Sequence, residues 1–570
     1  MLAAACLLAG AAMPLYAQNP PAGGGTTVTA EPAQPAPTDA QPAAPTQETP
    51  VIPDAIPVPP QPVSKLQELI DTKVAKFVSR KPEQEAVQAF YRAHDYKPLW
   101  SANGTALPKA AAAIEHLQNV RSEGLDPGDY PTPNMSKDTS KPMSEDEAAA
   151  ADLKLTAAVL TYARHASSGR VSFTRVSGAI LYPSHALEPG KVLEQLAAAD
   201  DVKPVLASFE PQQPGYKALK AELARLLVSP QAAEETPFKG KHGSAEAPSR
   251  DIVGTVIANL ERWRWLPRDL GDAYVMVNIP DFTLAVVNNG AQVWQTRIVA
   301  GKPGTAATPL LSETMKYLTL NPTWNVPPSI IRNEYLPALE RDPDALERVG
   351  LKVERNHDGS IRIYQPPGDD NALGHIRFNF PNPFLVYQHD TPTKALFARE
   401  SRAFSHGCMR VQNPDKYAEV LLSISQPNEG YSAARIKSMY GGDEKTIKLQ
   451  RFIPVHIAYQ TAFVDKPGHL ALRSDVYGLD AALLKLMRGP ERAVADVPIP
   501  RSYTSSSKPV MARLPTRPAT EDTANSGWGN NSGWNSGWGG QRWSDDNASV
   551  RSYASTPYRR RPVDRAVGDW

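Results

Sequence analysis

Cysteine is nearly absent from this chain of 570 residues, which contains two, Cys6 and Cys408. Two cysteines cannot build a disulfide framework, nor a zinc or iron–sulfur site that needs several thiolates. An excess of charge of one sign is lacking as well, because 61 Lys and Arg residues balance 60 Asp and Glu residues. No basic field therefore favours the binding of nucleic acid. No apolar run is long enough for an ordinary membrane span. The length predicts two or three folded units with connectors.

The beginning of the chain lacks cations, the first of which is Lys65. Residues 1–17 are apolar and rich in small residues, which is typical of a secretory signal peptide except for the missing positive start. Residues 18–64 are rich in proline and predict a disordered linker. We therefore expect an exported protein of the periplasm or cell envelope. The sequence leaves open whether the first segment is cleaved, retained as an anchor or lipidated at Cys6.

The other end of the chain, residues 498–570, is rich in Ser, Gly, Trp and Arg and repeats Ser-Gly-Trp three times. Five of the ten tryptophans lie there among glycines and asparagines that cannot form a core. This composition predicts a disordered tail, and the alternative is that its tryptophan faces bind glycan or envelope protein partners. The oligomeric state is not indicated.

Two folded regions are expected between these ends. Residues 65–250 carry apolar residues at helical spacing, as in 146–165, and predict a helical scaffold domain. Residues 251–497 begin with a helix over 252–265 and then become rich in strands. The expected strands are 274–279, 283–287, 293–298, 317–320, 361–364, 384–387 and 452–463, with a hairpin turn at Asn288-Asn289-Gly290 and a helix at 334–347. The fold class is therefore α+β.

The candidate site is centred on Cys408, the single thiol beyond the signal-like segment. A lone cysteine is usually a small buried hydrophobe. Here it follows Gly407, which lets backbone N–H groups approach a reacting carbonyl, and His389 and His406 lie within 19 residues. A thiol needs a base or a cationic partner to react near neutral pH. These residues predict a cysteine nucleophile.

Each neighbour of the thiol has an expected role. His389 is the general base, with its second ring nitrogen oriented by a carbonyl or by Asp390. His406 is two residues from the thiol, where an electrostatic or donor role fits better than proton transfer. Arg410 is suited to binding a substrate carboxylate.

The spacing of His389 and Ser405-His406-Gly407-Cys408 resembles the signature of the L,D-transpeptidase (YkuD-like) catalytic domain. Further segments, such as 259–267, 321–330 and 389–397, look like the large, multidomain periplasmic branch typified by YcbB. The resemblance covers about residues 65–490. One departure is that a compact peptidoglycan-binding module, usual in that branch, has no convincing counterpart between residues 204 and 250.

The resemblance implies a cysteine acyl-enzyme that releases D-Ala from peptidoglycan tetrapeptide stems and forms 3→3 cross-links between donor and acceptor stems. It implies Cys408 as nucleophile, His389 as base, and His406, Gly407 and the Cys408 N–H at the oxyanion hole. It also implies a capping insertion at about 330–373, sensitivity to carbapenems, and no cofactor or metal. The substrate-binding residues expected on this basis are Arg410, Ser405, Asp390, Tyr387 and Trp324, and Ser405 is also expected to hold the loop.

Three alternatives remain open at this point. Water could replace the acceptor amine, which would make the protein an L,D-carboxypeptidase. The chain could instead be a non-catalytic envelope scaffold that binds peptidoglycan, although an intact set of Cys408, His389 and His406 argues against this. A zinc site on the same three residues is disfavoured, because two ligands on one tight glycine turn do not complete a coordination shell.

Overall fold

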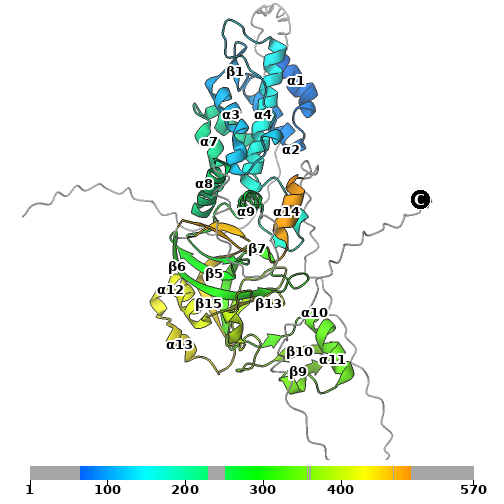
Figure 1. Ribbon diagram of the computed structural model, residues 1–570, viewed down its shortest axis with the longest axis vertical. Coiled ribbons are helices and arrows are strands. Elements are labelled where there is room, and N and C mark those ends of the chain that lie inside the picture. The colour runs from blue at the N-terminus through cyan, green and yellow to red at the C-terminus, as the bar shows by residue number, and fades with distance from the viewer. Residues whose placement is uncertain (1–63, 229–250, 356, 358–360, 466–467, 489–570) are drawn as a thin grey trace, which may run out of the picture. The chain divides into compact units, whose positions relative to one another are not determined.

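The computed structural model describes residues 64–228, 251–355, 357, 361–465 and 468–488. The expected signal segment, the proline-rich linker, residues 229–250 and the C-terminal tail lie outside these ranges. A helical region is followed by a strand-rich region (Figure 1), which confirms the expected α+β fold class. None of the described helices is long and apolar enough to cross a membrane.

The helical region packs around one hydrophobic core that includes Trp100, Tyr91 and Tyr162. Its main helices are α1 (Lys65–Lys73), α2 (Lys81–Ala93), α3 (Pro108–Gln118), α4 (Glu145–Ser168), α6 (Pro189–Ala198), α7 (Lys203–Ser208) and α8 (Pro214–Val228). Short elements between them are η1 (Val74–Lys76), β1 (Ser101–Ala102), β2 (Thr105–Ala106), η2 (Val120–Glu123), η3 (Pro127–Asp129) and α5 (Phe173–Val176).

Helix α4 is the central helix of this region, and its sequence explains its length. Ser144 and Glu147 form a capping box at its start, and Gly169 follows its end. Its Asp152 is fully buried and accepts hydrogen bonds from the Tyr91 hydroxyl (2.5 Å) and the Trp100 N–H (2.8 Å). This carboxylate ties α2 and the segment after it to α4.

Helix α9 (Ile252–Trp265) links the helical region to the strands. Its Arg264 is fully buried and forms an ion pair with Glu261 (3.2 Å). The same guanidinium donates to the Glu123 carbonyl (2.5 Å) and to the Tyr216 hydroxyl (3.0 Å), both of which belong to the helical region. The two regions therefore share buried polar contacts through α9.

The strands form a sheet that closes on itself. Its order is β11, β12, β14, β6, β5, β4, β15, β7 and β3, and β7 also pairs with β11, which joins the two sides; β13 pairs with β6. The strands are β3 (Ile180–Leu181), β4 (Ala273–Asn278), β5 (Thr283–Asn288), β6 (Ala291–Gly301), β7 (Leu310–Leu320), β11 (Ile376–Asn379), β12 (Gln388–His389), β13 (Ala403–Ser405), β14 (Met409–Val411) and β15 (Lys445–Ala458).

Helices and a small hairpin pack around this sheet. They are α12 (Pro414–Ser425), α13 (Ala433–Lys437), α14 (Leu479–Arg488), and the hairpin of β16 (Ala462–Val464) and β17 (Leu470–Leu472). The core of the sheet contains Leu318, Phe378, Val455 and Ile457, all fully buried. The core thus holds β11 and β7 firmly beside the strands that carry the candidate site.

A cap (residues 324–365) leaves the sheet after β7 and has its own small core of Val326, Ile330, Leu339, Leu346, Leu351 and Ile363. Its elements are β8 (Trp324–Asn325), α10 (Pro328–Ile330), η5 (Ile331–Tyr335), α11 (Leu336–Arg341), η6 (Glu347–Val349), β9 (Lys352–Arg355) and β10 (Ile361–Gln365). Figure 1 shows these elements as a lobe beside the sheet. A separate core allows this lobe to fold as a local unit.

The structure corrects three expected elements. The strand expected over 452–463 is divided, because β15 ends at Ala458 and β16 begins at Ala462. The helix expected over 334–347 is broken: α11 ends at Arg341, and Asp342 is extended because Pro343 disfavours helix at the residue before it. The strand expected over 384–387 is a turn, in which Leu385 has φ +58°. The Asn382 side chain accepts from the Phe384 and Val386 N–H groups (3.1 and 3.2 Å), so this backbone pairs with a side chain rather than with a strand.

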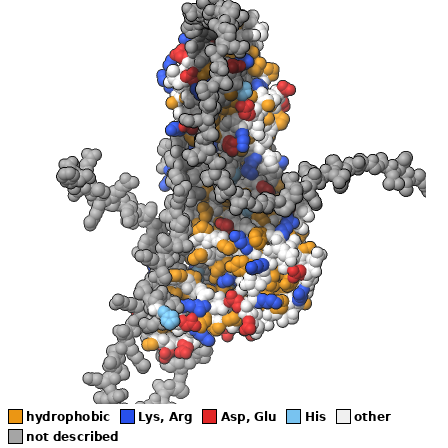
Figure 2. Space-filling model, turned by 180° about the vertical axis from the view of Figure 1, so that it is seen from behind, with side chains coloured by type: hydrophobic (Ala, Val, Ile, Leu, Met, Phe, Trp, Pro, Cys, Tyr) orange, Lys and Arg blue, Asp and Glu red, His pale blue; other side chains and the backbone are white. Residues whose placement is uncertain are grey.

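The surface of the strand-rich region carries charges of both signs. In Figure 2, Lys and Arg side chains alternate with Asp and Glu side chains and with hydrophobic groups over the described part of the visible face. This mixture matches the near-zero net charge of the sequence.

Candidate active site

Cys408 lies in the short loop between β13 and β14 and is partly buried. The Ser405 hydroxyl donates to the Cys408 carbonyl (2.5 Å) and accepts from the Gly407 N–H (3.2 Å). Gly407 has φ +116°, a conformation that residues with a Cβ rarely adopt. Ser405 therefore closes the loop from within, and glycine is required before the cysteine. Ser405 itself is buried, and the hydrogen bonds of its hydroxyl are made within this loop.

The register of three strands brings the other site residues together. His389 on β12 pairs with Arg410 on β14 and with Arg377 on β11. Directly paired residues project from the same face of a sheet, so these three side chains form a row. Cys408 and Tyr387 precede Arg410 and His389 by two residues, and the Met409 N–H donates to the Tyr387 carbonyl (3.0 Å). All five residues thus gather on one face.

The thiol of Cys408 is protonated at neutral pH. Burial raises its pKa to about 11, although hydrogen bonding to Tyr387 and the charge of Arg377 act in the opposite direction. The Tyr387 side chain hydrogen-bonds Cys408 and also Trp324 of the cap. Tyr387 therefore connects the thiol to the cap. The sequence predicted Tyr387 and Trp324 as substrate-binding residues and did not indicate this connection.

His389 is buried and neutral. Burial, and after it the cationic Arg410, lowers the pKa of the imidazole to about 3, and Arg377 and Lys394 add to the effect. A hydrogen bond with the Asp390 backbone favours the protonated ring but does not outweigh these causes. In the described part of the chain, the Nδ1 atom of His389 is buried without a hydrogen-bond partner. This nitrogen is available to accept a proton.

His406 forms a hydrogen bond with the cap. Its Nε2 atom forms a hydrogen bond with Glu334 Oε1 of the cap (2.8 Å), and both side chains are about half exposed. The placement of this imidazole at the oxyanion hole remains a prediction from the sequence. The cap therefore contacts the site at two points, Trp324 at Tyr387 and Glu334 at His406.

The Asp390 carboxylate has partners of its own. It forms an ion pair with Lys394 and accepts from the His375 N–H (3.1 Å), and it fills the space where a Cβ on Gly374 would stand. Its backbone, not its carboxylate, holds the His389 ring.

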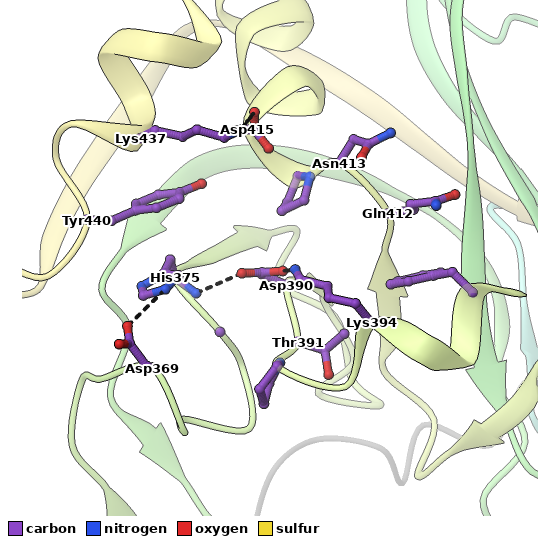
Figure 3. A pocket seen from close by; sticks show the side chains of 14 residues that line it. Asp369, His375, Asp390, Thr391, Lys394, Gln412, Asn413, Asp415, Lys437 and Tyr440 are labelled. Carbon is purple, nitrogen blue, oxygen red and sulfur yellow. Dashed lines mark hydrogen bonds and ion pairs between the residues drawn. The ribbon is translucent and has the colours of Figure 1, made fainter.

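Figure 3 shows the cavity that Asp390 lines, which has a volume of about 450 Å³. His375, Tyr440 and the Asp415–Lys437 ion pair (3.2 Å) also face it. Cys408 and His389 are not among its lining residues. The cavity is therefore a neighbour of the candidate site, and the thiol does not line it.

Arg377 is the site residue that sequence reasoning missed. Its guanidinium lies over the Tyr387 ring, 5.3 Å from the centroid, and its charge acts on both Cys408 and His389. A basic residue in a short strand eleven positions before Gln388 gives no local signal. Only the register of β11 against β12 reveals it.

These features agree with the comparison with protein families. Residues 272–430 match the L,D-transpeptidase catalytic domain, and residues 85–223 match the scaffold domain. The chain therefore combines an L,D-transpeptidase (YkuD) catalytic domain with a helical scaffold domain, which confirms the resemblance seen in the sequence.

Individual relatives are more distant. A candidate L,D-transpeptidase of Haemophilus influenzae is 28% identical over 247 residues, which are 40% of this chain and 49% of the relative, so the chain spans about half the length of the curated relative it matches. An L,D-transpeptidase from Mycobacterium smegmatis shares 16% identity over 33% of this chain and 58% of that chain, with a TM-score of 0.18. Mycobacterium tuberculosis L,D-transpeptidase 3, solved with a faropenem-derived adduct, shares 13% over 33% and 60%, with a TM-score of 0.17. Scores this low carry no conclusion about this chain.

Proposed function

We propose that this protein is an L,D-transpeptidase of the cell envelope that joins peptidoglycan stems through a Cys408 acyl-enzyme. The observation that carries the proposal is the position of Cys408 on one sheet face with His389 and Arg410, inside a domain of this family. The donor would be a tetrapeptide stem, and the bond attacked would be the amide between its third residue and D-Ala. The acceptor would be a side-chain amine of a second stem.

The acylation half begins with transfer of the Cys408 thiol proton to Nδ1 of His389, the buried nitrogen that lacks a partner among the described residues. The thiolate then attacks the carbonyl carbon of the third residue. The oxyanion would receive hydrogen bonds from the Cys408 N–H and from the Tyr387 hydroxyl, which already reaches the sulfur atom. As the C–N bond breaks, His389 gives this proton to the leaving nitrogen. D-Ala therefore departs with a neutral amine, and a thioester remains on Cys408.

The second half runs through the same groups in reverse. The acceptor amine attacks the thioester carbonyl and gives a proton to His389. The thiolate leaves as the new amide forms, and it takes the proton back from His389. One amide bond is exchanged for another, and neither a metal nor a redox partner is needed for the balance.

The protonation states of Cys408 and His389 in the free enzyme are consistent with a reaction that begins only when substrate binds. A thiol with a pKa of about 11 beside an imidazole with a pKa of about 3 does not form an ion pair in the free enzyme. Proton transfer must therefore be coupled to substrate binding, which removes water and adds new charges to the site. A thiol kept protonated is also a weaker target for oxidants.

Product analysis of wild type and Cys408→Ala tests the proposal. Wild type incubated with tetrapeptide-stem muropeptides should release D-Ala and give dimers linked between third residues, and Cys408→Ala should give neither. If wild type gives tripeptide monomers and no dimers, the protein is an L,D-carboxypeptidase and not a transpeptidase. Wild type that binds muropeptides but releases no D-Ala would leave the non-catalytic scaffold as the function.

A further inference from the structure

We propose that Arg377 and Arg410 form a carboxylate subsite on either side of His389, and that the α-carboxylate of the departing D-amino acid binds there and makes His389 a competent base. This inference rests on the proposed function and deepens it, because it names the part of the substrate that prepares the site for reaction. Arg377 would be a substrate-binding residue that lies outside the sequence motif.

The geometry places both guanidinium groups around the base. Arg377 and Arg410 are the direct register partners of His389 on β11 and β14, one on each side. The Arg377 guanidinium is held over the Tyr387 ring at 5.3 Å, and Tyr387 hydrogen-bonds Cys408. A ligand that bridges the two arginines would therefore lie directly over His389 and beside the thiol.

Both arginines lack an anion. Within the described ranges, neither Arg377 nor Arg410 forms an ion pair, and the Nε atom of Arg377 is buried without a hydrogen-bond partner. Burial lowers the pKa of Arg410, and no carboxylate among the described residues raises it. Two partly buried, unpaired guanidinium groups are unfavourable unless an anion joins them, and their planar donor sets match a carboxylate.

The chemistry of the leaving group identifies the anion. In a stem that ends in D-Ala, the carboxylate is attached to the carbon next to the scissile nitrogen. His389 must return a proton to that nitrogen, so the carboxylate necessarily comes close to the row of Arg377, His389 and Arg410. Since the acceptor amine occupies the place of the leaving amine in the second half, an acceptor with a carboxylate on the adjacent carbon fits the same subsite. Water brings no carboxylate and would be a poor acceptor.

The bound carboxylate changes the balance between base and thiol. The charged groups that act on His389 are Arg410, Arg377 and Lys394, and all three lower its pKa in addition to burial, while the Asp390 backbone bond raises it. At Cys408, Arg377 is the one cation that acts, after burial and the Tyr387 hydrogen bonds. A carboxylate between the arginines cancels two cations at His389 and one at Cys408. The gap between the two pKa values narrows, and proton transfer from thiol to imidazole becomes easier.

Stems with a modified end provide the first test. Wild type should cleave a tetrapeptide stem with a free terminal carboxylate at about 10- to 100-fold higher kcat/KM than the same stem with a terminal carboxamide, which corresponds to the strength of a charge-assisted hydrogen-bond pair. Arg377→Gln should lose this preference because kcat/KM falls for the stem with a free carboxylate and not for the carboxamide. Arg377→Lys should keep part of the preference. The acid limb of the kcat profile, which reports the enzyme–substrate complex, should lie at higher pH for the free stem than for the amide in wild type.

Arg435→Gln is the matched control, since Arg435 also lies over a tyrosine ring, Tyr431 at 4.5 Å, but belongs to α13 outside the site. Equal rates of wild type on both stems, or an equal loss on both in Arg377→Gln, would overturn the subsite.

Binding separates the subsite from the proposed reaction. In the Cys408→Ala background, which cannot turn over, calorimetric titration should show that Arg377→Gln weakens the free stem about tenfold or more and leaves the amide stem unchanged. That result would support the subsite even if wild type formed no product. Unchanged binding of the free stem in Arg377→Gln would refute it while leaving transpeptidation intact.

Discussion

At the scale of single residues, the reactivity of Cys408 depends on its hydrogen bonds with the backbone and the hydroxyl of Tyr387. Burial raises the pKa of the thiol to about 11, and the Tyr387 hydrogen bonds are the largest opposing cause. At neutral pH, about one Cys408 side chain in ten thousand is therefore present as the thiolate. Any change that weakens the Tyr387 contact should lower that fraction further.

Replacing Tyr387 by Phe tests this dependence. Alkylation of Cys408 by iodoacetamide in the free wild-type protein should rise about tenfold per pH unit between pH 8 and 10 and level off near the pKa of about 11. Tyr387→Phe should react about tenfold more slowly over that range, because a hydrogen bond to the charged thiolate is lost. Tyr364→Phe, which removes an exposed hydroxyl bonded to Glu354 (2.6 Å), is the control. A level rate below pH 9 in wild type would show that the thiol is already ionised.

Sequence reasoning reached the residues that stand next to one another in the motif. The spacing of Cys408 and His389 was sufficient to propose nucleophile and base. The partners of a side chain are decided by its three-dimensional neighbours, so the contact of His406 with Glu334 of the cap could not be predicted from the sequence. Arg377 was missed because strand register is set by long-range pairing, which a local pattern does not contain.

At the scale of elements, the cap is the part most independent of the sheet. Its core is small and separate, and its contacts to the site are single hydrogen bonds at Trp324 and Glu334. The exposed Glu334–His406 contact contributes at most about 1 kcal/mol. The cap should therefore open or unfold locally at a lower cost than the whole domain.

Ile363→Ala should loosen the cap and leave the sheet intact. Ile363 is 2% exposed, and loss of its side chain should cost about 2–4 kcal/mol within this small core. Hydrogen exchange should become faster over the cap, residues 324–365, and stay unchanged in β4 and β5. Val353→Ala is the matched control, because Val353 is the register partner of Ile363 but is 42% exposed. Faster exchange throughout the sheet would contradict a separate cap core.

Elements with a strong local pattern were predictable. The helix expected over 252–265 is α9 to the residue, and the hairpin at Asn288–Gly290 appears between β5 and β6 with positive φ at Asn289 and Gly290. The segment at 384–387 reads as a strand from its apolar residues, but the Asn382 side chain takes its N–H groups. A side chain that competes with strand pairing cannot be recognised from hydrophobic periodicity.

At the scale of the whole molecule, the described helical and strand-rich regions are joined through buried polar groups on α9. Arg264 and Glu261 are both fully buried, and Glu261 also accepts from the Val171 N–H (2.8 Å). Nothing in the sequence indicated this junction, because both residues read as part of an ordinary helix surface. Removing one partner of such a buried pair is costly, because the charge of the other partner stays buried without compensation.

Arg264→Met should destabilise both regions together. It leaves Glu261 buried without its cation, and the expected loss is about 3–5 kcal/mol in the free energy of unfolding. Thermal unfolding followed by far-ultraviolet circular dichroism and by tryptophan fluorescence should shift to lower temperature by the same amount. Arg451→Met, which breaks an exposed ion pair with Asp272 (3.3 Å), should change Tm little. Two separate transitions in Arg264→Met would show that the regions unfold independently.

The most direct test of the central claim is the mass of the protein during reaction. Wild type mixed with a tetrapeptide-stem muropeptide and quenched in acid should gain the mass of the stem less D-Ala, and peptide mapping should place this acyl group on Cys408. Cys408→Ala should gain no mass and release no D-Ala. Release of D-Ala by Cys408→Ala, or a stable acyl group on any other residue, would contradict the account.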